Sequence, residues 1–365
     1  MKRVLHIIEP TLESEAGHCF SFVESLCSAR SYADFELSIW VDRRAKLGSI
    51  EEYGASIHPY FFRRIRRIQE LFLLRKLLLR PGRIFISTSG RTDLILLDLA
   101  AGVNIPPKKV FMYFHWLRLS QSKASLFRKI ARRHPHIEVL GPTETVVRDL
   151  RDCGFSRAFV VPYPISSRRA ALPSDEFFSL LYAGAARKDK GFGLIVDLVE
   201  MLSSSHDQIP IKVQTSPDHY RRHDKQTKED LERLRRIGYP WLEEFPETLS
   251  ENVYGGIFKG AICLQPYDRE DFIDRISGVT LDSLSMGCPV VVPSGTWMAH
   301  TVRRFEAGIV VDDLAARSLM EAVEVIRVNY SLFSRRATEA GTVLHKELSS
   351  DHLLEHLTAD EPSGG

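Results

Sequence analysis

The residues best suited to chemistry lie in a turn at positions 184–191. An apolar run at 178–182 predicts a buried strand, which ends at Gly184 and is followed by a short polar loop. Lys190 and Gly191 then open a predicted helix, whose first backbone N–H groups suit a phosphate, and the lysine adds a positive charge at the same place. The turn therefore predicts a phosphate site, although an ordinary strand-to-helix turn with solvated lysines has the same pattern.

A second stretch, residues 261–294, predicts a buried strand, a polar loop, a helix that begins at Ser277 and Gly278, and another buried strand. Two carboxylates, Asp274 and Asp282, stand eight positions apart across the loop and the helix. In a parallel sheet such loops and helix N-termini meet at one sheet edge, where ligands of open α/β sheets bind. This stretch therefore predicts a ligand site that contains acidic groups.

Residues 261–294 resemble the donor-binding stretch of family 4 retaining glycosyltransferases, which have two facing Rossmann-like domains (the GT-B fold). In that family a Glu, seven residues and a second Glu precede a run x-x-x-x-G-x-P-V-V. Here both acids are Asp, and the rest of the run is present from Gly287 and Pro289 onward. The turn at 184–191 is similar to the family pattern G-R-L-x-x-E-K-G, with Ala185 in place of the arginine. The resemblance is specific in these two stretches and looser in the first 160 residues.

The resemblance implies a site for a nucleotide-diphosphate sugar. Asp282 would accept hydrogen bonds from the ribose hydroxyls, because a carboxylate is an acceptor-only group; Ser277 and Gly278 would lie beside it. Asp274 would contact the donor sugar and is a catalytic candidate. The residues expected to bind the diphosphate are Gly184, Lys190, Arg187, Arg275 and Gly17.

Four of these assignments leave alternatives open. Arg187 lies two residues after Ala185 and could supply the cation of the missing family arginine. Arg275 could form a bidentate contact with phosphate, or it could be an exposed loop charge, as could Asp274. Gly17 follows the first strand and would let the backbone approach the donor because it has no Cβ, or it is an ordinary loop glycine.

His115 follows the predicted strand 108–114, so it would lie at the sheet edge that faces the cleft between the domains. Family members often have a histidine at this strand end, near the reacting sugar. The resemblance implies a hydrogen bond to a sugar hydroxyl and not nucleophilic attack, because retaining enzymes of this fold are thought to react on the front face of the donor. A purely structural histidine is the alternative.

Residues 61–80 carry seven cations and one Glu and predict a basic amphipathic helix. Apolar residues fall on one face of that helix: Phe61, Ile65, Ile68 and Phe72. Such a helix can lie on an anionic membrane, or it can be a core helix with a solvated basic edge. The part from Leu71 to Leu79 is apolar nearly all round and is expected to be core. The candidates for membrane or acceptor contact are Arg63, Arg64, Arg66 and Arg67.

The chain of 365 residues is long enough for two domains. Alternating strand and helix patterns predict an α/β protein of two facing Rossmann-like, doubly wound domains with a cleft between them. The expected divisions are an acceptor-binding domain at 1–163, a linker at 164–176, a nucleotide-sugar-binding domain at 177–345 and a C-terminal segment at 346–365. The tail from Asp360 onward is expected to be disordered.

The charge and the cysteine content limit the kinds of partner and the cellular compartment that we expect. Residues 1–160 carry 26 Lys and Arg against 16 Asp and Glu, so the first half is basic and the rest acidic. A basic half suggests an anionic partner, but no nucleic-acid motif is present, and a nucleic-acid partner is not expected. The five cysteines show no metal spacing and are expected to be reduced and buried, as in the cytoplasm. No apolar run is long enough for a transmembrane helix, so any membrane contact would be peripheral, at the inner face.

These observations predict a metal-independent glycosyltransferase of the hexosyltransferase type, with the nucleotide sugar as substrate and no cofactor. The acceptor would be a glycan or a lipid-linked molecule in polysaccharide or glycolipid biosynthesis. Two alternatives stay open: a nucleotide-sugar epimerase of the same fold, and a nucleotide-sugar-binding protein without catalysis.

Overall fold

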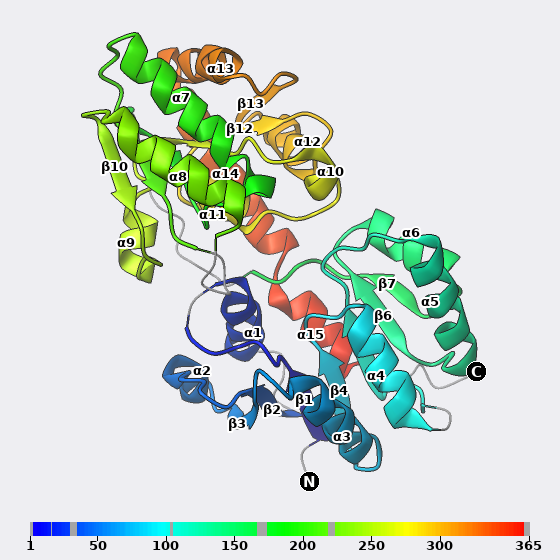
Figure 1. Cartoon of the computed structure of the whole chain (residues 1–365). Coiled ribbons are helices and arrows are strands. Elements are labelled where there is room, and N and C mark those ends of the chain that lie inside the picture. The colour runs from blue at the N-terminus through cyan, green and yellow to red at the C-terminus, as the bar shows by residue number, and fades with distance from the viewer. Residues whose placement is uncertain are drawn as a thin grey trace. The chain divides into compact units, whose positions relative to one another are not determined.

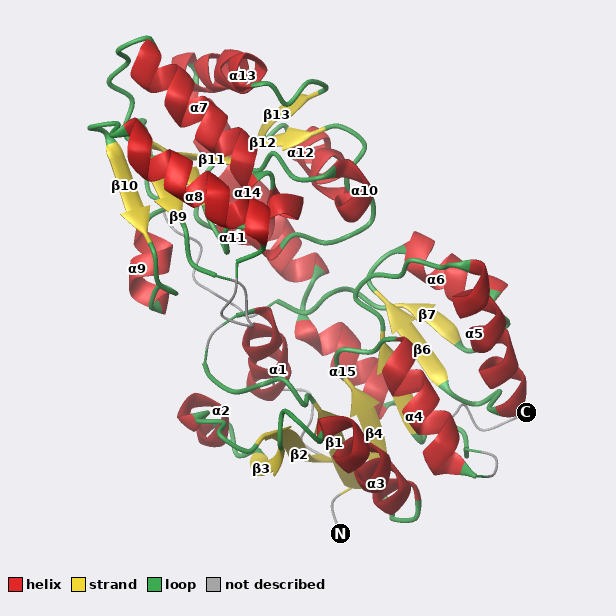
Figure 2. Ribbon diagram, in the orientation of Figure 1, coloured by secondary structure: helices red, strands yellow, loops and turns green. Residues whose placement is uncertain are grey.

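The computed structural model describes residues 3–15, 17–29, 35–102, 105–165, 174–217 and 223–360. The chain divides into two compact units (Figure 1), an N-terminal unit of Met1–Ser167 with Glu347–Gly365 and a C-terminal unit of Arg168–Lys346. Each unit has one parallel sheet with helices on both faces (Figure 2). The predicted fold class, two Rossmann-like doubly wound domains, is confirmed. Of the predicted linker, residues 166–173 lie outside the described residues, as do residues 361–365 of the predicted tail.

The N-terminal unit contains a seven-stranded sheet in the order β3-β2-β1-β4-β5-β6-β7. Its strands are β1 (Arg3–Ile8), β2 (Phe35–Asp42), β3 (Ser56–Phe61), β4 (Arg83–Ile86), β5 (Val110–Tyr113), β6 (Glu138–Gly141) and β7 (Ala158–Val160). Its helices are α1 (His18–Ser28), α2 (Gly48–Glu52), α3 (Arg66–Leu78), α4 (Arg91–Ala101), α5 (Gln121–Arg133), α6 (Glu144–Asp152) and α15 (Ser350–Thr358).

The C-terminal unit contains a six-stranded sheet in the order β10-β9-β8-β11-β12-β13. Its strands are β8 (Ser179–Tyr182), β9 (Ile211–Gln214), β10 (Leu242–Phe245), β11 (Ala261–Leu264), β12 (Val290–Pro293) and β13 (Gly308–Val311). A 3₁₀ helix, η2 (Lys188–Lys190), precedes the first α-helix. The α-helices are α7 (Phe192–Ser204), α8 (Lys225–Ile237), α9 (Glu251–Gly256), α10 (Arg269–Phe272), α11 (Gly278–Ser285), α12 (Trp297–Phe305), α13 (Ala316–Val328) and α14 (Tyr330–Glu347).

Alternate residues of the central strands pack on opposite faces of each sheet, as the two-residue repeat of a strand requires. In β4, Ile84 and Ile86 join the core that contains Leu94 of α4. Phe85 lies between them in sequence and packs on the other face, with its ring 6.2 Å from that of Phe22 in α1. Both faces are covered by helices, so the strand is an apolar run and shows no alternation of apolar and polar residues.

The C-terminal helix α15 belongs to the N-terminal unit and not to the unit that precedes it in the chain. His356 of α15 has its Nε2 atom 2.9 Å from a carboxylate oxygen of the fully buried Glu138, which also accepts a hydrogen bond from Arg157. Although burial raises it, the pKa of Glu138 falls to about 2 because of the hydrogen bonds from His356 and Arg157. Three leucines of α15 also pack into the core of the N-terminal unit: Leu353, Leu354 and Leu357.

The segment predicted as one basic helix is a strand, a turn and a helix. Phe61 is the buried last residue of β3, so it does not share a helical face with Ile65, Ile68 and Phe72, which are exposed. Helix α3 begins only at Arg66. The second half of the segment was expected to be core. This is confirmed for the buried leucines Leu73, Leu74 and Leu77, but Leu79 is exposed.

Candidate functional site

The two stretches singled out by the sequence lie together in the C-terminal unit. Strand β8 is hydrogen-bonded to β9 on one side and to β11 on the other, so the chain changes its winding direction between β8 and β11. Ligands of open α/β sheets bind outside the carboxyl ends of the strands at such a switch point. The loop after β8 contains residues 183–187, and the segment after β11 contains residues 265–277, which include the short helix α10. The topology therefore supports the predicted place of the site.

Gly184 begins the loop after β8 and is tightly surrounded. Its backbone N–H donates a hydrogen bond of 2.7 Å to the Oε1 atom of the buried Gln214 at the end of β9. Its φ is 89°, and a Cβ placed on it would lie 2.6 Å from Nζ of Lys190. The glycine thus lets the lysine ammonium lie directly against the backbone of the turn.

Gly191 brings the two loops into direct contact. It stands at the N-terminus of α7 with a φ of 67°, and a Cβ placed on it would lie 1.9 Å from the carbonyl oxygen of Pro266 in the loop after β11. The backbone N–H of Asp268 also donates a 2.9 Å hydrogen bond to the carbonyl oxygen of Asp189. The two loops therefore form one continuous site.

Three cations gather around Asp189 at this site. Nε of Arg187 donates a 2.7 Å hydrogen bond to Asp189, and Nη1 of Arg275 lies 3.6 Å from the same carboxylate. Lys190 has its Nζ 5.5 Å from the centre of the Tyr267 ring, and the guanidinium of Arg275 stacks on a further aromatic ring. Three positive side chains outnumber the two carboxylates that act on them, Asp189 and Asp271, and the excess of positive charge suits a polyanion such as a diphosphate.

The charge of Lys190 is sensitive to its surroundings. Burial and the neighbouring guanidinium groups of Arg187 and Arg275 lower the pKa of Lys190 to about 8. Both effects disfavour the charged form of the amine. A bound anion acts in the opposite direction, because it favours the ammonium ion.

Helix α11 positions the predicted ribose contact. Ser277 is buried and caps the helix, since its hydroxyl accepts a hydrogen bond from the backbone N–H of Thr280. Gly278 is the first residue of the helix and is exposed. Asp282 lies half-buried one turn later, and its Oδ2 atom accepts a 3.0 Å hydrogen bond from the hydroxyl of Tyr254 in α9. Burial and the Asp282 carboxylate raise the pKa of Tyr254, which keeps its proton and remains a donor.

Asp274, the predicted catalytic carboxylate, precedes Arg275 in the loop after β11. It is half-buried, and it makes neither a hydrogen bond nor an ion pair with the residues that the structure describes. Arg275 is one-third exposed and engaged with Asp189, so its side chain has a defined position within the cluster of cations.

Two predicted site residues, His115 and Gly17, belong to the N-terminal unit. Both lie in loops that follow strands of the N-terminal sheet. That sheet has its own switch point between β1 and β4. His115 follows β5, and its Nε2 atom lies 2.8 Å from the carbonyl oxygen of Ser87 after β4. The Ser87 hydroxyl in turn donates a 2.8 Å hydrogen bond to the buried Glu9 after β1. Gly17 precedes α1, and a Cβ on it would meet no atom within 4 Å, so packing within this unit does not require glycine there.

Aromatic rings around His115 add to its restraint. The centres of the Phe22 and Tyr113 rings both lie 5.1 Å from the centre of the imidazole. A histidine held by a backbone hydrogen bond and by packed rings has one preferred orientation. This geometry is compatible both with a structural histidine and with one that presents its imidazole to a sugar hydroxyl.

Sequence reasoning missed Asp189, Gln214 and Tyr254, which position the predicted residues. Asp189 directly precedes Lys190 in the sequence, so it could have been predicted as a neighbour of the cations from that position alone. Gln214 and Tyr254 approach from β9 and α9, which are distant in sequence from the groups that they contact, and no local pattern marks them.

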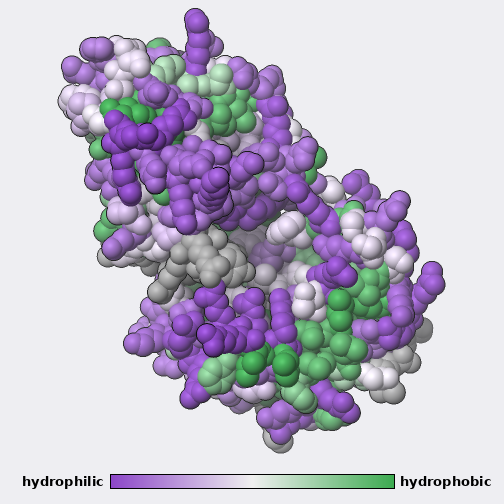
Figure 3. Space-filling model, viewed as in Figure 1, coloured by the Kyte–Doolittle hydropathy of each residue, from purple (hydrophilic) through white to green (hydrophobic). Residues whose placement is uncertain are grey.

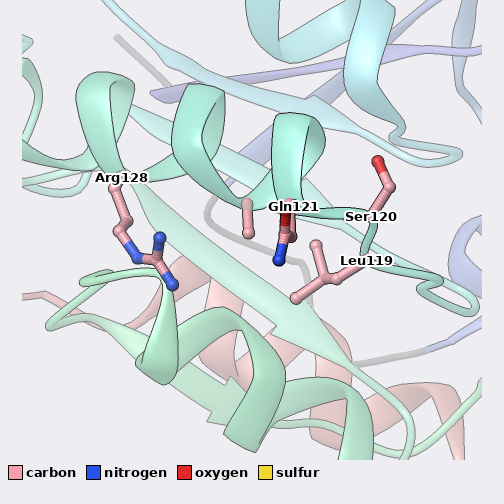
Figure 4. Close-up of a pocket in the computed structure, with 5 residues that line it drawn as sticks. Leu119, Ser120, Gln121 and Arg128 are labelled. Atoms are coloured by element: carbon pink, nitrogen blue, oxygen red, sulfur yellow. The ribbon is translucent and has the colours of Figure 1, made fainter.

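A pocket of about 450 Å³ lies at the start of α5 in the N-terminal unit (Figure 4). It is lined by Leu119, Ser120, Gln121, Ala124 and Arg128. None of the predicted site residues lines it. In the part of the chain that the structure describes, no group of three or more His, Cys, Asp or Glu side chains could hold a metal ion.

No protein-family model matches the sequence, and no curated protein matches it. Solved structures match nearly the whole chain. HepE of Anabaena, in complex with UDP and glucose, has a TM-score of 0.71 at 10% identity over 98% of this chain and 99% of its own. The same protein has also been solved with UDP-glucose.

Two further structures extend the comparison. Sucrose-phosphate synthase from Thermosynechococcus elongatus has a TM-score of 0.68 at 14% identity over 95% of both chains. WaaG, a glycosyltransferase involved in lipopolysaccharide biosynthesis, has a TM-score of 0.67 at 12% identity over 98% of this chain and 100% of its own. The chain therefore has the GT-B fold that these glycosyltransferases share, as the sequence predicts.

Proposed function

We propose that this GT-B protein is a retaining glycosyltransferase that uses a nucleotide-diphosphate sugar. The observation that carries the proposal is the cluster of Lys190, Arg187 and Arg275 at the switch point of the C-terminal sheet. A cluster of cations beside the N-terminus of α7 suits a diphosphate, because backbone N–H groups and positive side chains then act on the same anion. The complexes of HepE with UDP and UDP-glucose support a nucleotide sugar as the ligand of this fold.

The proposed chemistry is electrostatic. When the bond between the sugar and the diphosphate breaks, negative charge grows on the leaving phosphate. Lys190, Arg187 and Arg275 are already in position to stabilise that charge, and preorganised groups of this kind usually supply the largest catalytic effect. Because protein cations meet the charge, we infer that the reaction does not depend on a metal ion.

The remaining residues have proposed roles in positioning. Asp282 accepts hydrogen bonds from the ribose, with Ser277 and Gly278 shaping the start of its helix, and Asp274 contacts the donor sugar. His115 hydrogen-bonds a sugar hydroxyl, and the leaving phosphate helps to deprotonate the acceptor on the same face of the donor. The acceptor in this proposal is a glycan or a lipid-linked molecule.

The first test is thermal unfolding of the protein with UDP, GDP, ADP, CMP or dTDP, each with and without EDTA. A nucleotide present at 100 times its Kd stabilises the folded protein by about 2.7 kcal/mol, which gives a clear rise in Tm. We expect one nucleotide to raise the Tm, and the rise to persist in EDTA. If none of the five does so, the donor site is wrongly assigned. If one nucleotide raises the Tm, the corresponding nucleotide sugar is then incubated with the protein without an acceptor. Epimerisation of that sugar would mean that the protein is an epimerase and not a transferase.

Tyr254→Phe tests how Asp282 is positioned. The variant removes the hydroxyl that donates to the Asp282 carboxylate, and a hydrogen bond to a charged group stabilises by about 1.5–3 kcal/mol. We expect the affinity for the nucleotide to fall about tenfold, with little change in turnover at saturating donor. Isothermal titration calorimetry and steady-state kinetics measure the two effects.

Asp282→Ala separates the two possible failures of that test. If this variant binds the nucleotide much more weakly but Tyr254→Phe binds it normally, only the positioning role of Tyr254 is wrong. If both variants bind normally, Asp282 does not contact the nucleotide.

A further inference from the structure

An apolar stripe lies on the exposed side of helix α3 in the N-terminal unit. The stripe consists of Ile65 (48% exposed), Ile68 (58%), Phe72 (62%) and Leu79 (84%). A helix turns about 100° per residue, so these four side chains fall within an arc of about 60° and extend over about 20 Å of the helix. Exposed apolar patches that are rimmed by polar residues mark interaction sites.

Cations border this stripe on both sides. At about 100° per residue, Arg75 lies on one side of the stripe and Lys76 on the other, and both are exposed. Arg63 and Arg64 are exposed in the turn before the helix. We refer to the apolar stripe together with these four cations as the α3 surface. On the face of the molecule shown in Figure 3, hydrophobic residues gather over the N-terminal unit with hydrophilic residues around them.

The acidic group of this segment is turned away from the α3 surface. Glu70 is fully buried and pairs with Arg67, which also pairs with Asp93 at the start of α4. Burial and the nearby Asp93 raise the pKa of Glu70 to about 8. Arg67 is therefore paired with two carboxylates and is not assigned to the α3 surface. Of the four arginines predicted to contact a membrane or acceptor, we assign only Arg63 and Arg64 to that surface.

We propose that the α3 surface docks on an anionic lipid membrane, a role that does not depend on the proposed reaction. An apolar stripe bordered by cations is the pattern of a helix that lies in the membrane interface, with its apolar side chains below the phosphates and its cations beside them. In the part of the chain that the structure describes, no helix is long and apolar enough to cross a membrane.

Two other partners fit the α3 surface less well. A second copy of the chain would place the same cations against one another across a twofold axis, where they repel. Nucleic acid would neutralise the cations but would leave Ile68, Phe72 and Leu79 without an apolar partner. A lipid surface satisfies both the charge and the apolar stripe.

The test is flotation of the full chain with phosphatidylcholine vesicles, with or without phosphatidylglycerol. We expect binding to the anionic vesicles and little binding to the neutral ones. Phe72→Ser should weaken binding by about tenfold or more, since burial of a phenylalanine side chain is lost. Arg75→Gln and Lys76→Gln should each weaken it about fivefold, the scale of one cation near an anionic membrane. All these side chains are exposed, so we expect the Tm to be unchanged.

The matched control is Val325→Ser with Val328→Ser on α13, which removes two exposed apolar side chains (50% and 79% exposed) from the other unit. The control should bind vesicles as the unaltered protein does. The proposal is overturned if the control and Phe72→Ser lose binding equally, or if neutral and anionic vesicles bind alike. It is also overturned if Phe72→Ser changes only the oligomeric state, or if the protein binds nucleic acid and not vesicles. The nucleotide-induced rise in Tm is read separately, so a failure here leaves the proposed reaction untouched.

Discussion

Replacing Lys190 with alanine should lower turnover with the nucleotide-sugar donor by about 10²-fold or more, the scale of removing one preorganised charge-stabilising group. The ammonium of Lys190 lies against Gly184 and over the ring of Tyr267, so its position is set before any ligand binds. It can therefore stabilise the leaving diphosphate without a reorganisation cost during the reaction. Lys190→Met, which keeps most of the side-chain volume, should behave like the alanine variant. Initial rates at saturating donor measure the effect.

Lys188→Ala is the control, because Lys188 is exposed on the same 3₁₀ helix and lies outside the cation cluster around Asp189. It should retain nearly full activity. Equal losses for the two lysines would mean that general positive charge, and not the position of Lys190, assists the reaction. An unchanged rate for Lys190→Ala would remove Lys190 from the proposed mechanism.

The same lysine should make nucleotide binding depend on pH. Its pKa in the free protein is lowered to about 8, chiefly by burial and by the adjacent Arg187 and Arg275. Below pH 8 the amine is charged and ready to bind a diphosphate. Above pH 8 binding must first restore the proton, so affinity falls by about tenfold per pH unit until the pKa of the bound state is reached. Lys190→Ala should lose this dependence, and Lys188→Ala should keep it.

The sequence was most informative for short local patterns. Gly184, Lys190, Ser277 and Asp282 could be proposed as site residues from two stretches, because a parallel sheet brings successive strand-to-helix turns to the same edge. The adjacency of β8 and β11, which joins these turns into one site, is a property of the topology that the family resemblance implied and the structure confirms.

The contacts that position those residues could not be read in the same way. Tyr254 meets Asp282 across 28 positions in the chain, and Gln214 meets Gly184 across 30. Helix α15 has the leucine spacing of an amphipathic helix, but nothing in that spacing says that it packs on the unit at the other end of the chain. Long-range pairing of this kind depends on how the elements pack, which a periodic pattern does not encode.

The segment at 61–80 shows the same limit. The predicted helical face of Phe61, Ile65, Ile68 and Phe72 was wrong for Phe61, which ends β3, and right for the other three, which lie at the start of α3 or within it. Periodicity alone also does not say which face of a helix is covered. The helix buries the face with Leu73 and Leu77 and exposes the stripe that contains Ile68 and Phe72. The leucines of the covered face pack into the core, and Glu70 is buried on the same side and pairs with Arg67.

Gly191→Ala should destabilise the protein by about 2–5 kcal/mol and also weaken nucleotide binding, because one added carbon acts on both loops of the site. A left-handed residue with a side chain costs about 1–2 kcal/mol. The new Cβ would also lie 1.9 Å from the carbonyl oxygen of Pro266, and forcing backbone apart in a packed region costs about 1–3 kcal/mol more. The Pro266 loop would have to move, and it carries the Tyr267 ring that Lys190 contacts. Urea unfolding and calorimetric titration measure the two losses.

Gly238→Ala isolates the effect of the contact between the loops. Gly238 ends α8 with a φ of 63°, close to the 67° of Gly191, but a Cβ on it would meet no atom within 4 Å. This control should therefore lose only the conformational part, about 1–2 kcal/mol, and should bind the nucleotide normally. If the two variants lose stability and affinity equally, the contact between Gly191 and Pro266 does not hold the loops in their functional arrangement. If only Gly191→Ala loses affinity, the close approach of the two loops is a requirement of the site and not merely of the fold.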